Sequence, residues 1–330
     1  MIGLSRASSK LKTEHYFMNH IAIIGCGLIG RGWAIVFARS GYNVTLFDTH
    51  PQALDRALTH IGESMTRLNE LGLLNGDPKE LCNNIVYTES LETAVINADY
   101  VQENITEDVE LKKHFYKKLD QITKPECILA SSTSSIITSV FGFELKGRNR
   151  CIVVHPVNPP HLIPLVEISP APFTDDSVIE RTIDLQKSVK QKPILIKKEI
   201  PGFVLNRLQA AVLLESWQLV KEGYISVEDL DKTIKDGLGH RWAFMGPFET
   251  IDLNAKNGIA EYADTFGEKY RKMMKNERYS SWDDTLIKKI TASRRDIISK
   301  TDLGTREKWR DTLLAELLVH KISSVKKYGE

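Results

Sequence analysis

The sequence lacks any apolar segment long enough to cross a membrane. Its apolar runs, such as residues 21–24 and 34–38, are far shorter than the ~20 residues that a membrane-spanning helix needs. It also lacks an excess of either charge, since 44 Lys and Arg against 43 Asp and Glu give a formal net charge of +1. No basic stripe is interleaved with aromatic residues, whereas nucleic-acid binding depends on clustered Lys and Arg. We therefore expect neither a membrane nor a nucleic acid as a partner.

Cysteine is also scarce in this chain. The four cysteines are Cys26, Cys82, Cys127 and Cys151, and they are widely spaced with no C-x-x-C pair. Disulfide frameworks and metal sites group their cysteines more closely. We therefore expect reduced thiols in a cytoplasmic protein, and no metal site.

What the sequence does contain is an alternation of short apolar runs with helical patterns from residue 19 onward. The apolar runs are HIAIIG, NVTLF, NIVY, DYVQE, CILAS, CIVVH and PILIK. This alternation predicts an α/β fold, a doubly wound and mostly parallel sheet with helices on both faces. After Pro201 the strand patterns stop, so the rest of the chain is predicted to be a C-terminal all-helical domain.

At 330 residues the chain is long enough for two domains. We expect a disordered extension at residues 1–18, a sheet domain at 19–200 and a helical domain at 201–330. The extension is basic and rich in serine, so a targeting segment is one alternative. A misplaced start codon ahead of Met18 is another.

The run GCGLIG at residues 25–30 follows the first predicted strand and opens a helix. In a G-x-G-x-x-G loop Gly25 makes the tight turn, Gly27 lets backbone amides approach a pyrophosphate, and Gly30 lets the helix pack closely. The amino terminus of the helix adds partial positive charge for the phosphates. The run, with Leu28 and Ile29 inside it, predicts a Rossmann-type dinucleotide site.

Asp48 ends the second predicted strand, NVTLFD, 23 residues after Gly25. A carboxylate there accepts hydrogen bonds from the adenosine ribose hydroxyls and repels a 2′-phosphate. No Arg follows directly, since the next residues are Thr49, His50 and Pro51. The sequence therefore predicts NAD rather than NADP as the cofactor.

The run HPVNPPHLIPLVE places His155 after the strand CIVV and Glu167 twelve residues later. Ligand-binding residues of doubly wound sheets lie at the carboxyl ends of strands. A loop stiffened by prolines joins the two strands, and it can bring the carboxylate against the imidazole. The carboxylate would then orient the ring and stabilise the imidazolium that forms when His155 takes a hydroxyl proton.

Three further polar segments are ambiguous from the residues alone. The run SSTSS at residues 131–135 fits a helix cap as well as a substrate contact. Asn206 opens a long helical pattern, where a polar residue is ordinary. Glu103 and Glu107 fit a solvated helix start, which favours acids.

Together these motifs resemble the 3-hydroxyacyl-CoA dehydrogenase superfamily from about residue 19 into the C-terminal region. The chain is most similar to the branch that oxidises L-gulonate and that was also recruited as a lens crystallin. The motifs that carry the resemblance are GxGLIGRGWAIVFA, VQENITEDVELKK, SSTSS, HPVNPPHLIPLVE, PGFVLNRLQ, GLGHRWAFMGPFET and KWRD.

The resemblance implies roles for the matching positions. His155 would be the general base and Glu167 its partner, Ser134 and Asn206 would contact the reacting oxygen, and Asn158 would support the site. The residues implied to hold NAD are Gly25, Gly27, Gly30 and Asp48, with Glu107 and Lys112 near the nicotinamide end. The resemblance also implies a homodimer formed through the helical domain.

The residues themselves favour a small hydroxy acid over an acyl-CoA. Residues 49–78 contain no Lys and only Arg56 and Arg67, so the arm that takes CoA phosphates in this family carries little positive charge. Arg241, in GLGHRWAFMGP, can hold a substrate carboxylate in a bidentate fork. A surface or interface salt bridge is the alternative for Arg241.

The expected reaction is NAD-dependent oxidation of L-gulonate to 3-dehydro-L-gulonate. L-carnitine is an alternative substrate, because Trp242 and Phe244 would attract its quaternary ammonium. A short 3-hydroxybutyryl-CoA is a second alternative. A structural crystallin without activity is the alternative from another class of protein.

Overall fold

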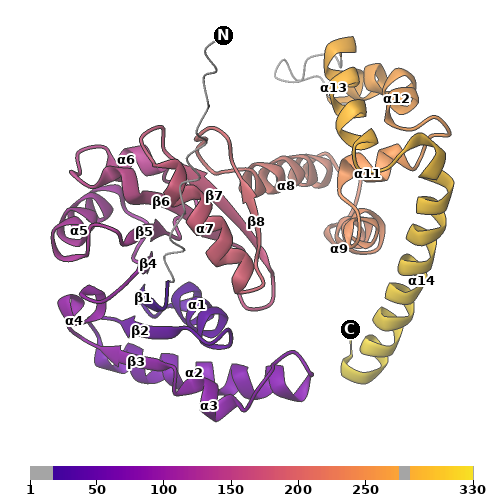
Figure 1. Cartoon of the computed structure of the whole chain (residues 1–330). Coiled ribbons are helices and arrows are strands. Elements are labelled where there is room, and N and C mark those ends of the chain that lie inside the picture. Colours follow the sequence, from indigo (N-terminus) through magenta and orange to yellow (C-terminus); the bar gives the residue numbers. More distant parts are fainter. Residues whose placement is uncertain (1–17, 275–282, 330) are drawn as a thin grey trace, which may run out of the picture. The chain divides into compact units, whose positions relative to one another are not determined.

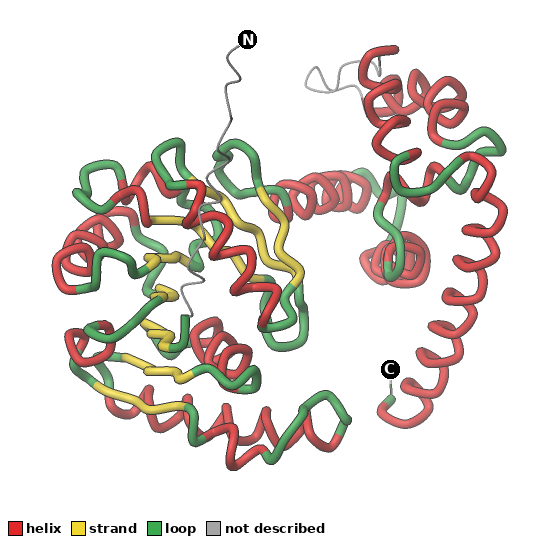
Figure 2. The backbone as a smooth tube through the Cα atoms, in the orientation of Figure 1, coloured by secondary structure: helices red, strands yellow, loops and turns green. Residues whose placement is uncertain are grey.

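The computed structural model describes residues 18–274 and 283–329. The chain divides into two compact units, Met1–Val212 and Leu213–Glu330. Apart from Met18, the predicted N-terminal extension lies outside the described residues. Figures 1 and 2 show a sheet unit followed by a helical one.

The first unit is built on one eight-stranded sheet with the order β3-β2-β1-β4-β5-β6-β7-β8 (Figure 1). The strands are β1 (His20–Ile24), β2 (Asn43–Phe47), β3 (Ile85–Thr88), β4 (Tyr100–Glu103), β5 (Ile128–Ser131), β6 (Cys151–Pro156), β7 (Leu165–Pro170) and β8 (Lys192–Leu195). Neighbouring strands are parallel except for β6 and β7, which are antiparallel. The predicted α/β class with a mostly parallel sheet is therefore confirmed.

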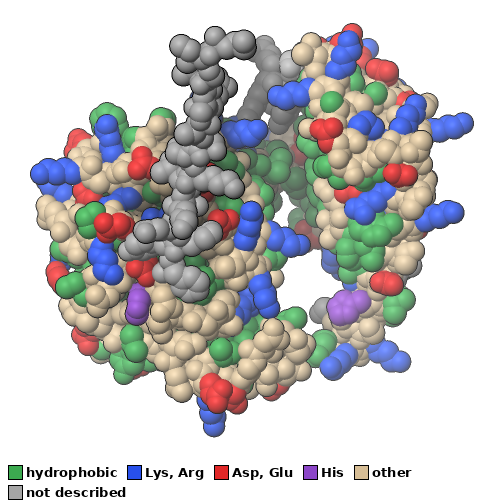
Figure 3. Space-filling view, viewed as in Figure 1, with side chains coloured by type: hydrophobic (Ala, Val, Ile, Leu, Met, Phe, Trp, Pro, Cys, Tyr) green, Lys and Arg blue, Asp and Glu red, His purple; other side chains and the backbone are tan. Residues whose placement is uncertain are grey.

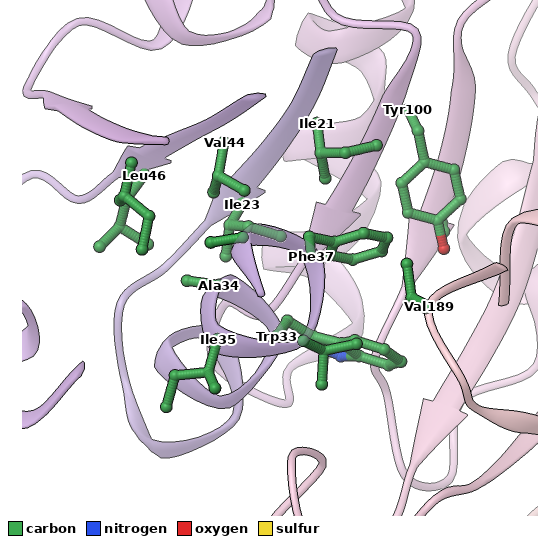
Figure 4. Close-up of a cluster of buried hydrophobic side chains, with 14 of the residues drawn as sticks. Ile21, Ile23, Trp33, Ala34, Ile35, Phe37, Val44, Leu46, Tyr100 and Val189 are labelled. Atoms are coloured by element: carbon green, nitrogen blue, oxygen red, sulfur yellow. The ribbon is translucent and has the colours of Figure 1, made fainter. Parts of the chain in front are cut away.

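Helices cover both faces of the sheet. They are α1 (Leu28–Ala38), α2 (Pro51–Glu70), α3 (Pro78–Cys82), α4 (Leu91–Val95), α5 (Val109–Ile122), α6 (Thr138–Gly142) and α7 (Asp176–Ser188), with a 3-10 turn η1 (Arg148–Arg150). Side chains alternate along β1, so that Ile21 and Ile23 pack with α1, α2 and α7, while Ala22 and Ile24 pack with α4, α5 and α6. Figure 4 shows the first of these layers, where Trp33 of α1 lies close to the strands.

The second unit, with the helix that leads into it, is helical throughout the described residues. Its elements are α8 (Leu205–Lys221), α9 (Val227–Lys232), a π-helical turn η2 (Thr233–Leu238), α10 (Gly239–Trp242), α11 (Pro247–Asp252), α12 (Ile259–Met274), α13 (Asp284–Arg295), a 3-10 turn η3 (Lys300–Asp302) and α14 (Leu303–Tyr328). Met245, Leu253 and Leu303 form a small core. The fully buried Asp252 forms ion pairs with Arg294 and Arg295. The predicted helical C-terminal region is confirmed.

No helix in the described part of the chain is both long and apolar enough to cross a membrane. On the face that Figure 3 shows, Lys and Arg are interspersed with Asp and Glu.

Candidate active site

The glycine loop between β1 and α1 is shaped to receive a phosphate. Gly25 has φ +85°, and its amide donates to the Phe47 carbonyl at 2.8 Å. A Cβ on Gly30 would lie 1.8 Å from the Gly25 carbonyl oxygen, so only glycine lets α1 pack on the turn. A Cβ on Gly27 would meet nothing within 4 Å, and no side chain caps α1. The loop therefore fits a pyrophosphate held by the free amides of the first turn.

The two residues inside the loop are placed differently. Leu28 is 51 % exposed, whereas Ile29 is half-buried and packs against the core of the sheet. A groove of about 720 Å³ borders the loop and includes Gly25, Gly27 and Asp48 in its wall. It continues past Asn104 and Thr106, at the carboxyl end of β4. Its position at the carboxyl ends of parallel strands is where such sheets bind dinucleotides.

Asp48 lies beside the loop, directly after β2. Its Oδ2 accepts from the Cys26 amide at 3.1 Å and the Cys26 thiol at 3.2 Å, and its Oδ1 accepts from the His50 amide at 3.1 Å. Burial alone would raise the pKa of Asp48, but these hydrogen bonds lower it overall. The carboxylate is therefore ionised at neutral pH. Since a carboxylate has about four acceptor positions, capacity remains for ribose hydroxyls.

His155 and Glu167 lie opposite each other on the antiparallel strands β6 and β7. His155 Nδ1 and Glu167 Oε2 are 2.8 Å apart, and both residues are buried. Burial alone would raise the pKa of Glu167, but hydrogen bonds from His155 and two backbone amides lower it overall. An ionised carboxylate only accepts, so Nδ1 carries the proton and Nε2 is left as the base. Phe203, whose ring centre is 5.2 Å away, packs against the imidazole.

The amino terminus of α8 joins this pair to the serine segment. Glu167 Oε1 accepts from the amides of Val204 and Leu205, each at 2.9 Å. The next residue, Asn206, donates through Nδ2 to the Ser134 carbonyl at 2.8 Å. The structure therefore brings four residues singled out from the sequence, His155, Glu167, Ser134 and Asn206, to one end of the sheet. The amides of Val204 and Leu205 were not predicted, because no side-chain pattern marks them.

Glu107 organises the serine segment. Its Oε1 accepts from the Thr133 hydroxyl at 2.6 Å, from the Ser134 and Ser135 amides at 2.9 and 3.1 Å, and from both serine hydroxyls at 3.3 and 3.1 Å. Burial alone would raise the pKa of Glu107, but the Thr133 hydrogen bond and the charge of Lys112 lower it overall. Glu107 therefore holds the loop that presents Ser134. The predicted contact of Glu107 with a nicotinamide is compatible with this geometry, because 37 % of its side chain is exposed.

Lys112 does not lie as expected at the cofactor surface. Its side chain is only 1 % exposed, and its ammonium donates to both oxygens of the buried Glu103 at 2.8 and 2.9 Å. Glu103 also accepts from the Ser131 hydroxyl and the Ile105 amide. Glu107 is 3.7 Å from the ammonium. Lys112 thus lies behind Glu107 and not at the surface. Glu103 ends a buried strand and does not open a solvated helix. Both charges can be buried because Lys112 and Glu103 form an ion pair with each other.

Ser132, within the SSTSS run, and the predicted Asn158 have different surroundings. Ser132 is tied into the sheet unit, since its hydroxyl accepts from Trp33 and Gln102 and donates to Asn104. Asn158 is exposed in the loop after β6, three residues from His155. Its side chain forms no hydrogen bond with any other described residue, so its amide is available to a ligand.

Arg241 belongs to α10, in the second unit. Within the described residues its guanidinium has no carboxylate partner. Burial raises the pKa of Tyr262 to about 12, and the positive charge of Arg241 opposes this rise. Trp242 and Phe244 are each 39 % exposed. An arginine with no acidic partner among the described residues of its unit can bind an anion.

A dinucleotide groove and a buried His–Glu pair beside an ordered serine loop define a nicotinamide-dependent dehydrogenase that acts on an alcohol. In the described residues, no group of three or more His, Cys, Asp or Glu could hold a metal ion. Two family models match the chain, namely the NAD-binding domain of 3-hydroxyacyl-CoA dehydrogenase at residues 20–200 and its C-terminal domain at residues 202–295. The chain belongs to the 3-hydroxyacyl-CoA dehydrogenase family and is an NAD-dependent 3-hydroxy acid dehydrogenase.

Relatives of two kinds are similar to the chain in sequence. The lambda-crystallin homolog of Rattus norvegicus is 39 % identical over 305 residues, covering 90 % of this chain and 94 % of that protein. The L-carnitine dehydrogenase of Oceanobacillus iheyensis is 37 % identical over 251 residues, covering 76 % and 81 %. Among solved structures, the 3-hydroxyacyl-CoA dehydrogenase of Archaeoglobus fulgidus aligns with a TM-score of 0.68 at 28 % identity, covering 84 % and 88 %. The expected family and cofactor are confirmed, and the substrate stays a prediction.

Proposed function

We propose that the enzyme oxidises L-gulonate at C3 to 3-dehydro-L-gulonate. The observation that carries the chemistry is the buried hydrogen bond between His155 Nδ1 and Glu167. It leaves Nε2 to accept the proton of the C3 hydroxyl as the C–H bond breaks. NAD, when bound, supplies the acceptor for the hydride that leaves C3. The products are a 3-keto acid, NADH and one proton.

The ionised Glu167 stabilises the imidazolium that forms during the reaction. General-base catalysis of this kind contributes about 10²–10⁴-fold to the rate. Ser134 and Asn206 flank the position of the reacting oxygen, and their backbone and side-chain contacts with each other and with Glu107 hold them there. They would orient the hydroxyl toward the base and donate to the developing carbonyl oxygen.

The charge distribution supports a small acid as the substrate. On the arm after β2, Arg67 is paired with Glu70 at 3.1 Å, which leaves Arg56 as its one arginine without a carboxylate partner among the described residues. A CoA ester carries several phosphate charges that this arm would balance poorly. Arg241, by contrast, has no carboxylate partner among the described residues, and its guanidinium matches one carboxylate.

The enzyme is also proposed to be a cytoplasmic homodimer. Large apolar side chains of α8 and α14 are exposed, among them Leu214, Trp217, Val319 and Ile322 at 61–76 %. Apolar faces of this kind commonly pack against a second subunit. All four cysteines are free thiols, in keeping with a reducing compartment. Sedimentation analysis would show a mass near 75 kDa for the dimer, twice the 37.4 kDa of the chain, and a monomer would contradict it.

The test is the initial rate of NADH formation with L-gulonate, L-carnitine and L-3-hydroxybutyryl-CoA. We expect a clear preference for L-gulonate, and Arg241→Met should then raise KM for L-gulonate at least about tenfold, as for loss of a charged hydrogen-bonded pair. A preference for carnitine would contradict the proposal and direct attention to Trp242 and Phe244. A preference for the CoA ester would show that the arm after β2 binds phosphates despite its low charge. No activity with any of the three would favour a structural crystallin.

A further inference from the structure

A second cavity, of about 590 Å³, adjoins the cofactor groove. It shares Gly27, Asp48 and His50 with the groove, so the two meet at the carboxylate of Asp48. Its other walls come from the first turn of α1, which carries Arg31, and from the first two turns of α2, which carry Arg56. Asp48 therefore separates the cofactor groove from a cavity that carries two guanidinium groups.

The cavity has more positive than negative charge. Within the described part of the chain, neither the Arg31 nor the Arg56 side chain forms a hydrogen bond or an ion pair. Asp48 accepts from Cys26 and His50 instead of from either arginine. Two unpaired guanidiniums beside one committed carboxylate make a binding site for an anion, and guanidiniums suit phosphate in particular.

The position of the cavity indicates which phosphate it can receive. A carboxylate at the position of Asp48 binds the 2′-hydroxyl of the adenosine ribose in this class of fold. A group attached to that oxygen would have to replace the contact with Asp48, at the border of the second cavity. We propose that Arg31 and Arg56 form a latent subsite for the 2′-phosphate of NADP, and that the charge of Asp48 keeps the enzyme selective for NAD.

The arginines of this subsite are not next to Asp48 in the sequence, so the residues that follow Asp48 do not reveal them. The residues directly after Asp48 contain no arginine, which favours NAD. The fold nevertheless brings one arginine from α1 and one from the second turn of α2 to the same carboxylate. In the wild-type protein the negative charge of Asp48 opposes a phosphate dianion and outweighs their attraction, because it lies closest to the ribose oxygen.

The test is a set of fluorescence titrations with NADPH and NADH, which require no alcohol substrate. We compare the wild type with Asp48→Asn, with the triple variant Asp48→Asn/Arg31→Met/Arg56→Met, and with Asp48→Asn/Arg67→Met as the matched control. Arg67 lies on the same helix as Arg56 but does not line the cavity. We expect Asp48→Asn to tighten NADPH binding at least about tenfold, the scale of a hydrogen bond to a charged group.

The triple variant should lose most of that gain, while its affinity for NADH stays within about threefold of that of Asp48→Asn, and the control should keep the gain. The proposal is overturned if the triple variant binds NADPH as tightly as Asp48→Asn. It is also overturned if the two arginine changes weaken NADH and NADPH equally, since they would then serve the dinucleotide in general. Because only cofactor binding is measured, neither result depends on whether L-gulonate is the substrate.

Discussion

Replacing Glu167 with Gln removes one charge from the centre of the site with almost no change in volume. Both oxygens of this buried carboxylate are engaged. Oε2 is 2.8 Å from His155 Nδ1, and Oε1 accepts from the Val204 and Leu205 amides. A glutamine has one oxygen and one NH₂ group for these two directions, so the variant must choose between two orientations.

The structure decides between these orientations. If the NH₂ group faces α8, the amides of Val204 and Leu205 lose their acceptor, and each buried unsatisfied donor costs about 1–3 kcal/mol. If the oxygen faces α8, both amides stay satisfied and the NH₂ group faces His155. The second orientation keeps both backbone amides paired and leaves only one N–H of the new amide without a partner, so it is the one we expect. A donor opposite Nδ1 forces the imidazole proton onto Nε2, which then cannot accept the hydroxyl proton.

The expected effect is therefore the loss of general-base catalysis, about 10²–10⁴-fold in kcat. The carboxylate that stabilises the imidazolium is lost at the same time. Cofactor binding should change little, because the glycine loop and Asp48 do not contact Glu167. The measurement is kcat with the preferred substrate, together with the Kd of NADH and the unfolding midpoint in urea.

His155→Gln is the matched control, since it removes the base itself. The double variant should be no slower than His155→Gln alone, because residues that act as one unit are not additive. Glu167→Gln with more than about a tenth of the wild-type kcat would refute the reasoning, since the general-base contribution is at least about 10²-fold. Multiplicative losses in the double variant would refute it as well, because the two residues would then act independently.

Three further predictions follow from the same geometry. Gly30→Ala should prevent folding or lower the free energy of unfolding by at least about 3 kcal/mol, whereas Gly27→Ala should fold normally and weaken NADH binding. Urea unfolding and NADH titration measure the two effects. A Gly30→Ala variant as stable as the wild type would contradict the tight packing of α1. The folded state lowers the pKa of Glu167, so this group stabilises the fold above its usual pKa of 4.5, and that contribution is lost as the pH falls through the lower folded value. Glu167→Gln should lack this part of the acid dependence in urea unfolding between pH 6 and about 3, and identical profiles would exclude it. Burial raises the pKa of Cys26 to about 12, so iodoacetamide at pH 8 should label Cys26 far more slowly than the half-buried Cys82. Mass analysis of the peptides measures both rates, and equal labelling would contradict the burial of Cys26.

The parts of the fold that follow from local pattern were predictable from the sequence. Short apolar runs bounded by turn residues marked the strands, and the change to helical periodicity after Pro201 marked the second part of the chain. The glycine spacing at residues 25–30 is also a local pattern, and the contact that requires glycine at position 30, with the Gly25 carbonyl, lies within the same strand–turn–helix unit. The pairing of His155 with Glu167 also has short range, since the two strands that carry them are consecutive and antiparallel.

The contacts that the sequence did not predict are formed between distant segments. The family resemblance predicted Lys112 near the nicotinamide end of the cofactor, and only the fold shows that it is buried against Glu103. Arg31 and Arg56 lie 25 residues apart on two helices, and although Arg31 falls within the GxGLIGRGWAIVFA motif, no sequence motif joins the two. A sequence pattern cannot predict that these two side chains lie close together, because this depends on how α1 and α2 pack on the sheet.

The structure also shows why the base and the oxygen-binding residues are expected to act together. The amides of Val204 and Leu205 hold Glu167, and the adjacent Asn206 holds the Ser134 carbonyl. One turn at the start of α8 thus fixes the orientation of the imidazole through Glu167 and the position of the serine loop directly. A displacement of this turn would misplace the proton acceptor and the hydroxyl-binding groups at once. Substitutions that distort it should therefore lower kcat without a matching loss of NADH affinity, since the glycine loop and Asp48 lie on other elements.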